Sequence, residues 1–254
     1  MKKTIGFIGG GRITRIFLQA FQNKGFLPDK IAVFDISNEV LLALHQKYPK
    51  VEIASLEAVA SQDIVFIALH PPVILDTIEQ VKGLITPDAC VISLAPKITI
   101  EKITAKLNGL VNVGRLIPNV TSYINKGYNP VCFSKNFNKK EDILDILNIL
   151  GETFIVEEPK LEAYAIASAM LPTYFWFQWQ EIHQIGSKMG LDENESRETV
   201  KKTLIAAIDT LYHSGLSYEE VIDLIPVKPI AAHESQIREV LSNTLCALFE
   251  KIKP

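Results

Sequence analysis

The stretch IGFIGGGRITRIFLQAF, residues 5–21, restricts the fold of this chain more than any other feature. A short apolar run of strand type leads directly into three consecutive glycines, and apolar residues then recur at the spacing of one helix face. A second apolar run, IAVFD, follows and ends at Asp35. The succession of strand, glycine turn, helix and strand predicts the opening unit of a parallel α/β sheet.

The glycine turn has the composition of a dinucleotide site. The first glycine allows a sharp turn, and the second lets the backbone come close to a pyrophosphate. The N–H groups and the positive dipole end at the start of the helix would face the phosphates. A carboxylate at the end of the second strand could accept hydrogen bonds from the adenine ribose. The residues expected to bind the coenzyme here are Gly9, Gly10, Gly11, Arg12, Ile13 and Asp35.

Two residues of this stretch are unusual, and they leave the choice of coenzyme open. Thr14 stands where Gly or Ala normally allows close helix–strand packing, so we expect a small shift of the helix rather than a lost site. Arg12 either reaches a phosphate or lies in solvent on the first turn. Asp35 would repel a 2′-phosphate, which favours NAD. Arg12, Ser37 and Asn38 could nevertheless accommodate NADP, so NADP or NAD is expected.

Strand-type runs continue to alternate with helical stretches as far as the segment VNVGRLIPN, which ends at residue 119. This alternation predicts right-handed crossovers and a doubly wound, Rossmann-type parallel sheet with helices on both faces. Ligands in such sheets lie beyond the carboxyl ends of the strands. The residues at the later predicted strand ends are Leu69, His70, Pro71, Ser93, Ala95, Pro118 and Asn119. All of these except Pro118 are expected to bind the coenzyme.

After about residue 157 the strand signals stop. We therefore predict a Rossmann-type domain over residues 1–157 and an all-α domain over residues 158–254. The second domain opens with one long helix, or with two joined near Pro172, and Asp192 or Asn194 is expected to cap the next helix. Aromatic residues cluster at 174–179, and a helix that is apolar on all sides is buried or packs on a partner. We expect dimerisation through this domain, with stacking of the aromatics on a coenzyme as the alternative.

Composition excludes several classes of protein. The net charge of -3 argues against a general nucleic-acid binder, and no apolar run reaches the ~18 to 20 residues that span a bilayer. Glycines interrupt the opening MKKTIGFIGGG and no cleavage site follows, so a cytoplasmic protein is expected. Cys90, Cys132 and Cys246 lie in apolar settings and are predicted to be buried thiols in a reducing compartment. The histidines show no metal-ligand spacing, and no metal is expected.

Several segments, in the same order along nearly the whole chain, together resemble the pyrroline-5-carboxylate reductase family. IGFIGGGRI resembles the family's opening fingerprint, and DIVFIALHPP its fourth-strand segment. VISLAPKIT is similar to the family's Ser-Ile-Ala-Ala-Gly-Ile segment, and GRLIPNVTSYINKG to its Arg-x-Met-Pro-Asn stretch. EEPKLEAYAIASAMLPTYFW resembles the segment that opens the family's helical domain. The resemblance implies a Rossmann domain followed by a helical dimerisation domain, and a homodimer through the C-terminal helices.

The resemblance also implies an activity, that of an NAD(P)-dependent oxidoreductase of proline biosynthesis. Hydride would pass from a reduced nicotinamide to a cyclic imine such as 1-pyrroline-5-carboxylate, while the protein positions the reactants and excludes water. The nicotinamide would lie near Ser93, Ala95, Pro118 and Asn119, and the substrate between this face and the helical domain. His70 stands where the family usually has Lys and could donate the proton. His70 and Asn119 are the catalytic candidates.

The substrate region departs from the family pattern. The family's carboxylate-binding loop is of the type Ser-Pro-Gly-Gly-Thr-Thr, and the corresponding stretch here, VKPIAAHES, keeps only the proline. A tight cradle of amides needs glycine geometry, so the chain binds an anion in another way or has no carboxylate site. Pro172, Lys228 and His233 are the substrate candidates, although Lys228 and His233 also suit an ordinary charged loop. Two alternatives stay open: a reductase of a different small imine or carbonyl compound, and a non-catalytic dinucleotide-binding paralogue.

Overall fold

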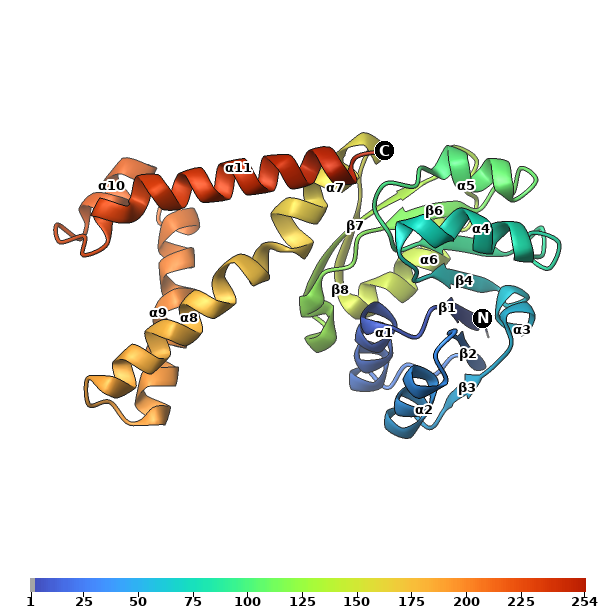
Figure 1. Ribbon diagram of the computed structural model, residues 1–254, viewed down its shortest axis with the longest axis horizontal. Helices are drawn as coiled ribbons and strands as arrows, with labels where there is room; N and C mark the ends of the chain where they lie inside the picture. The colour runs from blue at the N-terminus through green and yellow to red at the C-terminus, as the bar shows by residue number, and fades with distance from the viewer. Residues whose placement is uncertain (1–2) are drawn as a thin grey trace. The chain divides into compact units, whose positions relative to one another are not determined.

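The computed structural model describes residues 3–254, which divide into two compact units (Figure 1). Unit 1 extends to Met170 and includes the C-terminal residues Leu248–Pro254, while unit 2 is Leu171–Ala247. The boundary predicted after residue 157 lies within unit 1, just beyond its last strand, which ends at Ile155. As a domain boundary it stays a prediction.

A mixed sheet forms the centre of unit 1. In the described part of the chain its eight strands lie in the order β3-β2-β1-β4-β5-β6-β7-β8. Strands β1 to β6 are parallel, β7 is antiparallel to β6, and β8 is parallel to β7. The predicted Rossmann-type sheet is confirmed. The strands are β1 Thr4–Ile8, β2 Lys30–Phe34, β3 Val51–Ile53, β4 Ile64–Ile67, β5 Cys90–Ser93, β6 Val113–Leu116, β7 Gly127–Phe133 and β8 Gly151–Ile155.

Helices cover both faces of this sheet because successive strand residues point to opposite sides. Phe7 and Phe66 join the apolar cluster under α1, α2 and α6, whereas Ile8 and Ile67 join the cluster under α3, α4 and α5. Ile252, near the C-terminus, packs against the second cluster. The helices of unit 1 are α1 Arg12–Asn23, α2 Asn38–Lys47, α3 Leu56–Ala60, α4 Pro71–Val81, α5 Ile100–Lys106, α6 Lys140–Leu147 and α7 Leu161–Tyr164.

The sheet reverses its direction of growth between β1 and β4. From β1 the chain adds β2 and β3 on one side, and from β4 it adds β5 and β6 on the other. The amide of Ala68, just after β4, donates to the carbonyl of Ile8 at the end of β1, with N···O 2.8 Å. Such a switch point is where open α/β sheets bind ligands, beyond the carboxyl ends of the strands.

Unit 2 is helical, with α8 Leu171–Lys188, α9 Glu193–His213, α10 Tyr218–Asp223 and most of α11 Glu234–Ile252. Before it, the chain forms a π-helical turn over Ala165–Ala169. Asp192 caps α9: its carboxylate accepts from the amide of Glu195, and the carboxylate of Glu195 accepts from the amide of Asp192, which confirms one of the two predicted caps. No described helix, α8 included, is long and apolar enough to cross a membrane.

The three cysteines lie in different environments. Cys90 and Cys132 are buried, as predicted, whereas Cys246 on α11 is exposed, so its predicted burial is wrong. The reason is that its apolar neighbours along the sequence do not close over it within unit 2. Burial raises the pKa of Cys90 to about 11 and that of Cys132 to about 12. Both thiols therefore stay protonated at neutral pH, which makes them poor nucleophiles.

Candidate functional site

The turn after β1 is shaped by the end of β4. Gly9 has φ 107, a conformation that residues with a side chain rarely adopt. A Cβ on Gly9 would lie 2.5 Å from the carbonyl oxygen of Ala68. The amide of Gly9 donates to the carbonyl of Phe34 at the end of β2, with N···O 2.7 Å. Gly9 therefore lets the chain turn tightly within the switch point, in contact with both neighbouring strands.

Asp35 braces the same turn. Its Oδ2 accepts from the amide of Gly10 at 2.8 Å, and its Oδ1 accepts from the amide of Ser37 at 2.9 Å. Ser37 in turn caps α2, because its hydroxyl accepts from the amide of Val40 at 3.3 Å. Each carboxylate oxygen has a second lone pair, so Asp35 can still accept a hydrogen bond from a ribose hydroxyl. The carboxylate thus ties the glycine turn to the start of α2 and keeps some binding capacity.

The start of α1 is open. A Cβ added to Gly11, the N-cap residue, would meet no other atom within 4 Å in the described part of the chain. The first amides of an α-helix have no intrahelical acceptor, and glycine offers no side chain to cap them. The first helical amide bond runs from Arg15 to the carbonyl of Gly11, with N···O 3.2 Å. These amides, the helix dipole and the empty space together suit a diphosphate.

Thr14 replaces the usual third small residue and fits the turn. It is fully buried, and its hydroxyl donates to the carbonyl of Gly9 with O···O 2.5 Å. The extra atoms relative to glycine therefore form a bond across the turn. Thr14, in place of the usual Gly or Ala, therefore adds a hydrogen bond to the turn and does not disrupt it.

The start of α4, on the other side of the switch point, differs from that of α1. His70 is the N-cap residue with an exposed side chain, and Pro71 and Pro72 follow at the first two helical positions. Proline has no N–H group, so α4 offers fewer donors to an anion than α1 does. Leu69 is partly buried against the cluster beneath α4. Of the two helix starts at the switch point, α1 therefore offers more free amides to an anion, and the exposed imidazole of His70 lies at the start of α4.

Two predicted coenzyme contacts at the end of β5 lie below the surface. Ser93 is 0% exposed and Ala95 is 3% exposed. The hydroxyl of Ser93 has no hydrogen-bond partner within the described residues. Contact between these two residues and a coenzyme stays a prediction. Among the residues that follow, up to the start of α5, Lys97 is exposed, whereas Ile98 is buried.

The side-chain amide of Asn119 forms all of its hydrogen bonds within unit 1. Its Oδ1 accepts from the amide and the hydroxyl of Thr121, and its Nδ2 donates to the carbonyl and the hydroxyl of Ser168. Its own amide donates to Oδ1 of Asn129 at 2.8 Å. An asparagine amide has two donors and about two acceptor positions, so these contacts saturate it. Asn119 shapes the end of β6, and its catalytic role stays a prediction.

A buried ionic cluster beside this edge was missed by the sequence analysis. Arg115 in β6 is fully buried and pairs with Glu158, 43 residues later, and with Glu162, 47 residues later. The sequence does contain one signal for it, a charged residue within the apolar run VNVGRLIPN. A charge in a buried strand requires a partner of opposite charge. The partners themselves cannot be identified from spacing.

The substrate candidates lie in unit 2. Pro172 is partly buried in the first turn of α8, while Lys228 and His233 are exposed in the segment between α10 and α11. Residues 231–233 form a short 3₁₀ turn instead of a glycine loop. Within residues 3–254, no group of three His, Cys, Asp or Glu side chains could hold a metal ion.

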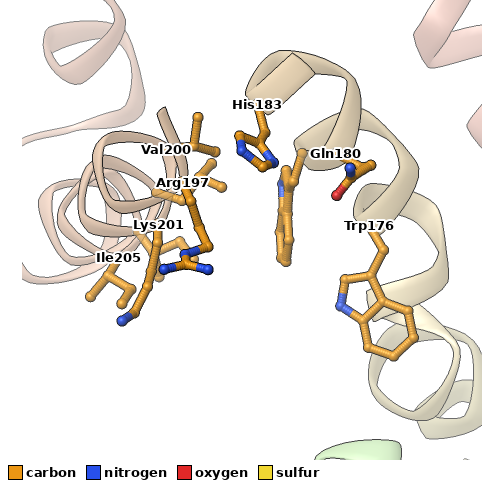
Figure 2. A pocket seen from close by; sticks show the side chains of 10 residues that line it. Trp176, Gln180, His183, Arg197, Val200, Lys201 and Ile205 are labelled. Carbon is orange, nitrogen blue, oxygen red and sulfur yellow. The ribbon is translucent and has the colours of Figure 1, made fainter. Parts of the chain in front are cut away.

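Unit 2 also has a hollow of about 450 Å³ between α8 and α9 (Figure 2). Its walls are mostly apolar and aromatic, and two cationic side chains from α9 lie among them. An indole from each of two positions on α8 faces the hollow. The lining residues are Trp176, Trp179, Gln180, His183, Arg197, Val200, Lys201, Leu204, Ile205 and Ile208.

Comparison with known proteins shows which reductases the chain is similar to. A family model described as NADP oxidoreductase coenzyme F420-dependent matches residues 4–97. The pyrroline-5-carboxylate reductase of Haemophilus influenzae is 24% identical over 212 residues, covering 81% of this chain and 77% of that protein. Pyrroline-5-carboxylate reductase 2 of Bacillus subtilis is 26% identical over 224 residues, covering 86% and 80%. Over most of its length the chain is similar to pyrroline-5-carboxylate reductases, which agrees with the resemblance found in the sequence.

Solved structures of this family have the same fold. Pyrroline carboxylate reductase of Plasmodium falciparum, with NADP bound, matches with a TM-score of 0.83 at 21% identity, covering 99% of this chain and 97% of that one. The 1-pyrroline-5-carboxylate reductase of Streptococcus pyogenes matches with a TM-score of 0.77 at 19% identity, covering 99% and 96%. The Rossmann-type sheet followed by helices is therefore the family fold.

Proposed function

We propose that this protein is an NAD(P)H-dependent reductase that reduces the C=N bond of a cyclic imine, 1-pyrroline-5-carboxylate in the first instance, in proline biosynthesis. The observation that carries the proposal is the start of α1, where Gly11 leaves open space in front of helical amides without a capping side chain. Similarity to reductases supports the reaction class, because the Haemophilus influenzae and Bacillus subtilis relatives are named as pyrroline-5-carboxylate reductases.

In this proposal the residues of unit 1 bind the coenzyme and orient it. The amides at the start of α1 hold the diphosphate, and Asp35 accepts a hydrogen bond from the adenine ribose while it keeps the turn in place. When bound, NAD(P)H supplies a hydride to the imine carbon, and the imine nitrogen takes up a proton. Placement of the two reactants in a site that excludes water is the protein's main contribution.

We assign the proton to His70. Its side chain is exposed at the carboxyl end of β4, on the edge of the switch point, and α4 does not use it as a capping side chain. Imidazole can carry a proton at neutral pH and release it to a nitrogen. His70→Asn should lower kcat, and an unchanged kcat would remove His70 from the reaction.

Either NADP or NAD fits the site. The two backbone amides on Asp35 partly offset its charge, which lowers its repulsion of a 2′-phosphate. Arg12 is exposed on the first turn of α1 and is free to approach that phosphate. The Plasmodium falciparum relative is described with NADP bound. Fluorescence titrations with NADPH and NADH measure the preference directly.

The first experiment is an assay of the full chain with NADPH or NADH and 1-pyrroline-5-carboxylate, followed at the absorbance of the reduced coenzyme. We expect oxidation of the coenzyme that depends on the imine. Tight coenzyme binding without turnover would remove this substrate, and absence of coenzyme binding would remove the proposal as a whole.

A different small imine or carbonyl substrate is the second candidate. Residues 231–233 form an exposed 3₁₀ turn where the resemblance led us to look for a glycine cradle. Lys228 and His233 are basic side chains of this segment, and we propose that they bind the anionic end of the substrate, with Pro172 lining the site. A panel of cyclic imines and keto acids, tested with the preferred coenzyme, separates the two candidates.

We further propose that the protein is a homodimer through unit 2. The hollow between α8 and α9 (Figure 2) is lined by apolar side chains, and exposed apolar residues such as Phe177 lie on the same helices. A partner commonly covers such a surface. Sedimentation velocity at micromolar concentration should give a mass near twice 28.3 kDa. A monomer at that concentration would contradict the proposal.

We place the protein in the cytoplasm. Its cysteines form no disulfide in the described part of the chain, which fits a reducing compartment. Fractionation of cells that express the chain, with detection in the cytoplasmic fraction, tests this location.

A further inference from the structure

We propose that Arg115, Glu158 and Glu162 form a buried ionic clamp that positions the backbone of residues 94–100, a loop that connects β5 to the first residue of α5. The inference rests on the proposed function, in which the nicotinamide end of the coenzyme lies at this strand end. The three side chains would be positioning residues. They would act on hydride transfer through the loop and would not touch the reactants.

The clamp begins beside the end of β5. Arg115 in β6 is paired in register with Ser93, the last residue of β5. Its guanidinium is 0% exposed and donates through NH1 to Oε1 of Glu158 at 2.9 Å and through NH2 to Oε1 of Glu162. The planar guanidinium presents several N–H donors in a fixed geometry, and the two carboxylates accept from it.

The same two carboxylate oxygens also hold the loop. Oε1 of Glu162 accepts from the amide of Lys97 at 2.9 Å, and Oε1 of Glu158 accepts from the amide of Ile100 at 2.7 Å. Lys97 has φ 77, a left-handed conformation that is uncommon for a residue with a side chain. The loop is thus held in an unfavourable local conformation by bonds to carboxylates from the segment that follows β8.

Stability alone does not explain this arrangement. A buried ion pair is often no more stabilising than apolar residues of the same volume, because desolvation offsets the attraction. The cluster also leaves Nε of Arg115 and Oε2 of Glu162 without partners within the described residues. The arrangement does fix the position of the loop. The planar guanidinium orients two carboxylates, and each carboxylate holds one backbone amide of the loop.

The test compares the whole coenzyme with a fragment that lacks nicotinamide. Glu158 is the better site for substitution, since its side chain is 28% exposed and less dependent on burial than Glu162. For Glu158→Ala in the full chain, we expect kcat to fall on the order of 10-fold and NAD(P)H to bind more weakly. Binding of ADP-ribose or its 2′-phosphate should not change. Glu158→Gln keeps an acceptor for the amide of Ile100 and should restore much of the lost activity.

Asp142→Asn is the matched control. The Lys3–Asp142 pair is also a close ion pair in unit 1, with N···O 2.6 Å, but it contacts no residue of the loop. This variant should leave kcat and both binding constants unchanged. Glu162→Ala serves as a second variant with the same expectation as Glu158→Ala; if it does not fold, Glu158→Ala and Glu158→Gln decide the question.

The outcomes separate the inference from the proposed function. If the wild-type protein binds coenzyme but the Glu158→Ala variant loses affinity for NAD(P)H and for the fragment equally, or for neither, the clamp does not position the loop. If the wild-type protein binds coenzyme without reducing the pyrroline, the substrate assignment fails, and the ratio of the two affinities still decides the inference. If the wild-type protein binds no coenzyme, both fail together.

Discussion

The two units of this protein differ in what holds them together. Unit 1 has an apolar cluster on each face of its sheet, built from strands and helices alike. In unit 2, as described over residues 171–247, Ser196 is the one buried side chain, and its hydroxyl donates to the carbonyl of His183 at 2.7 Å. Several of the large apolar side chains of unit 2 are mostly exposed, among them Phe177 at 68% and Met189 at 81%.

The difference shows that helix formation and core formation are separate problems. The helices of unit 2 have good local signals, such as the capping boxes at Asp192 and Ser217. Those signals fix where a helix begins, but they bury little apolar surface. Isolated helices are marginal in water, so the partner proposed above would stabilise unit 2 more than unit 1.

The largest expected effect is the loss of cooperative unfolding when unit 2 is produced without unit 1. Residues 171–247 produced alone should show no cooperative thermal transition by circular dichroism at concentrations where they are monomeric, because a single copy of this unit lacks a buried core. The full chain should unfold cooperatively. Sharp, reversible unfolding of a monomeric unit 2 would break the contrast between the units.

Thiol reactivity should separate the units by orders of magnitude. Below about pH 11 Cys90 is protonated, and below about pH 12 so is Cys132, because burial disfavours both thiolates. At pH 8 only a small fraction of either is reactive, and rising pH should increase the rate. Cys246 is exposed and should react with a thiol reagent within minutes. A Cys246 as slow as the other two would show that its surface is covered in solution.

Glycine substitutions in unit 1 separate the residues needed for stability from those needed for coenzyme binding. Gly9→Ala places a Cβ against the carbonyl of Ala68 at φ 107 and should reduce the free energy of unfolding by about 3 kcal/mol. Gly11→Ala meets no atom within 4 Å in the described chain, so it should unfold like the wild type and yet bind coenzyme more weakly. Denaturant titration and coenzyme titration measure the two effects. Equal loss of stability in both variants would argue against a site at Gly11.

A charged substitution on the exposed face of unit 2 tests whether this face forms the dimer interface. Phe177→Asp should shift the protein from dimer to monomer in sedimentation experiments, because a carboxylate is costly to bury at an interface. Leu42→Asp is the control, since Leu42 is 65% exposed on α2 of unit 1. Dissociation by the control substitution and not by Phe177→Asp would place the interface on unit 1.

The smallest effect concerns a single hydroxyl in unit 1. Thr14→Val keeps the shape of the side chain but removes the bond to the carbonyl of Gly9. The free energy of unfolding should fall by about 1 kcal/mol, the usual contribution of one such bond. Denaturant titration measures it. An unchanged free energy would mean that the hydroxyl does not support the turn.

The sequence by itself determined the elements whose signals are local. The run of strand, glycine turn and helix at residues 5–21, the alternation up to β6 and the cap at Asp192 all depend on residues within a few positions of one another. The strands β7 and β8 were not anticipated. Pro130 lies within β7, and proline in a strand normally argues against a paired position.

Only the tertiary structure decided which residues meet. It showed that Thr14 bonds to Gly9, that Asn119 is saturated by Thr121 and Ser168, and that Cys246 stays exposed. It also joined Arg115 to carboxylates more than forty residues away. The physical reason is that periodicity and caps arise from short-range geometry, which the neighbouring residues carry. Which distant groups satisfy a buried charge or cover an apolar face depends on how the whole chain closes on itself.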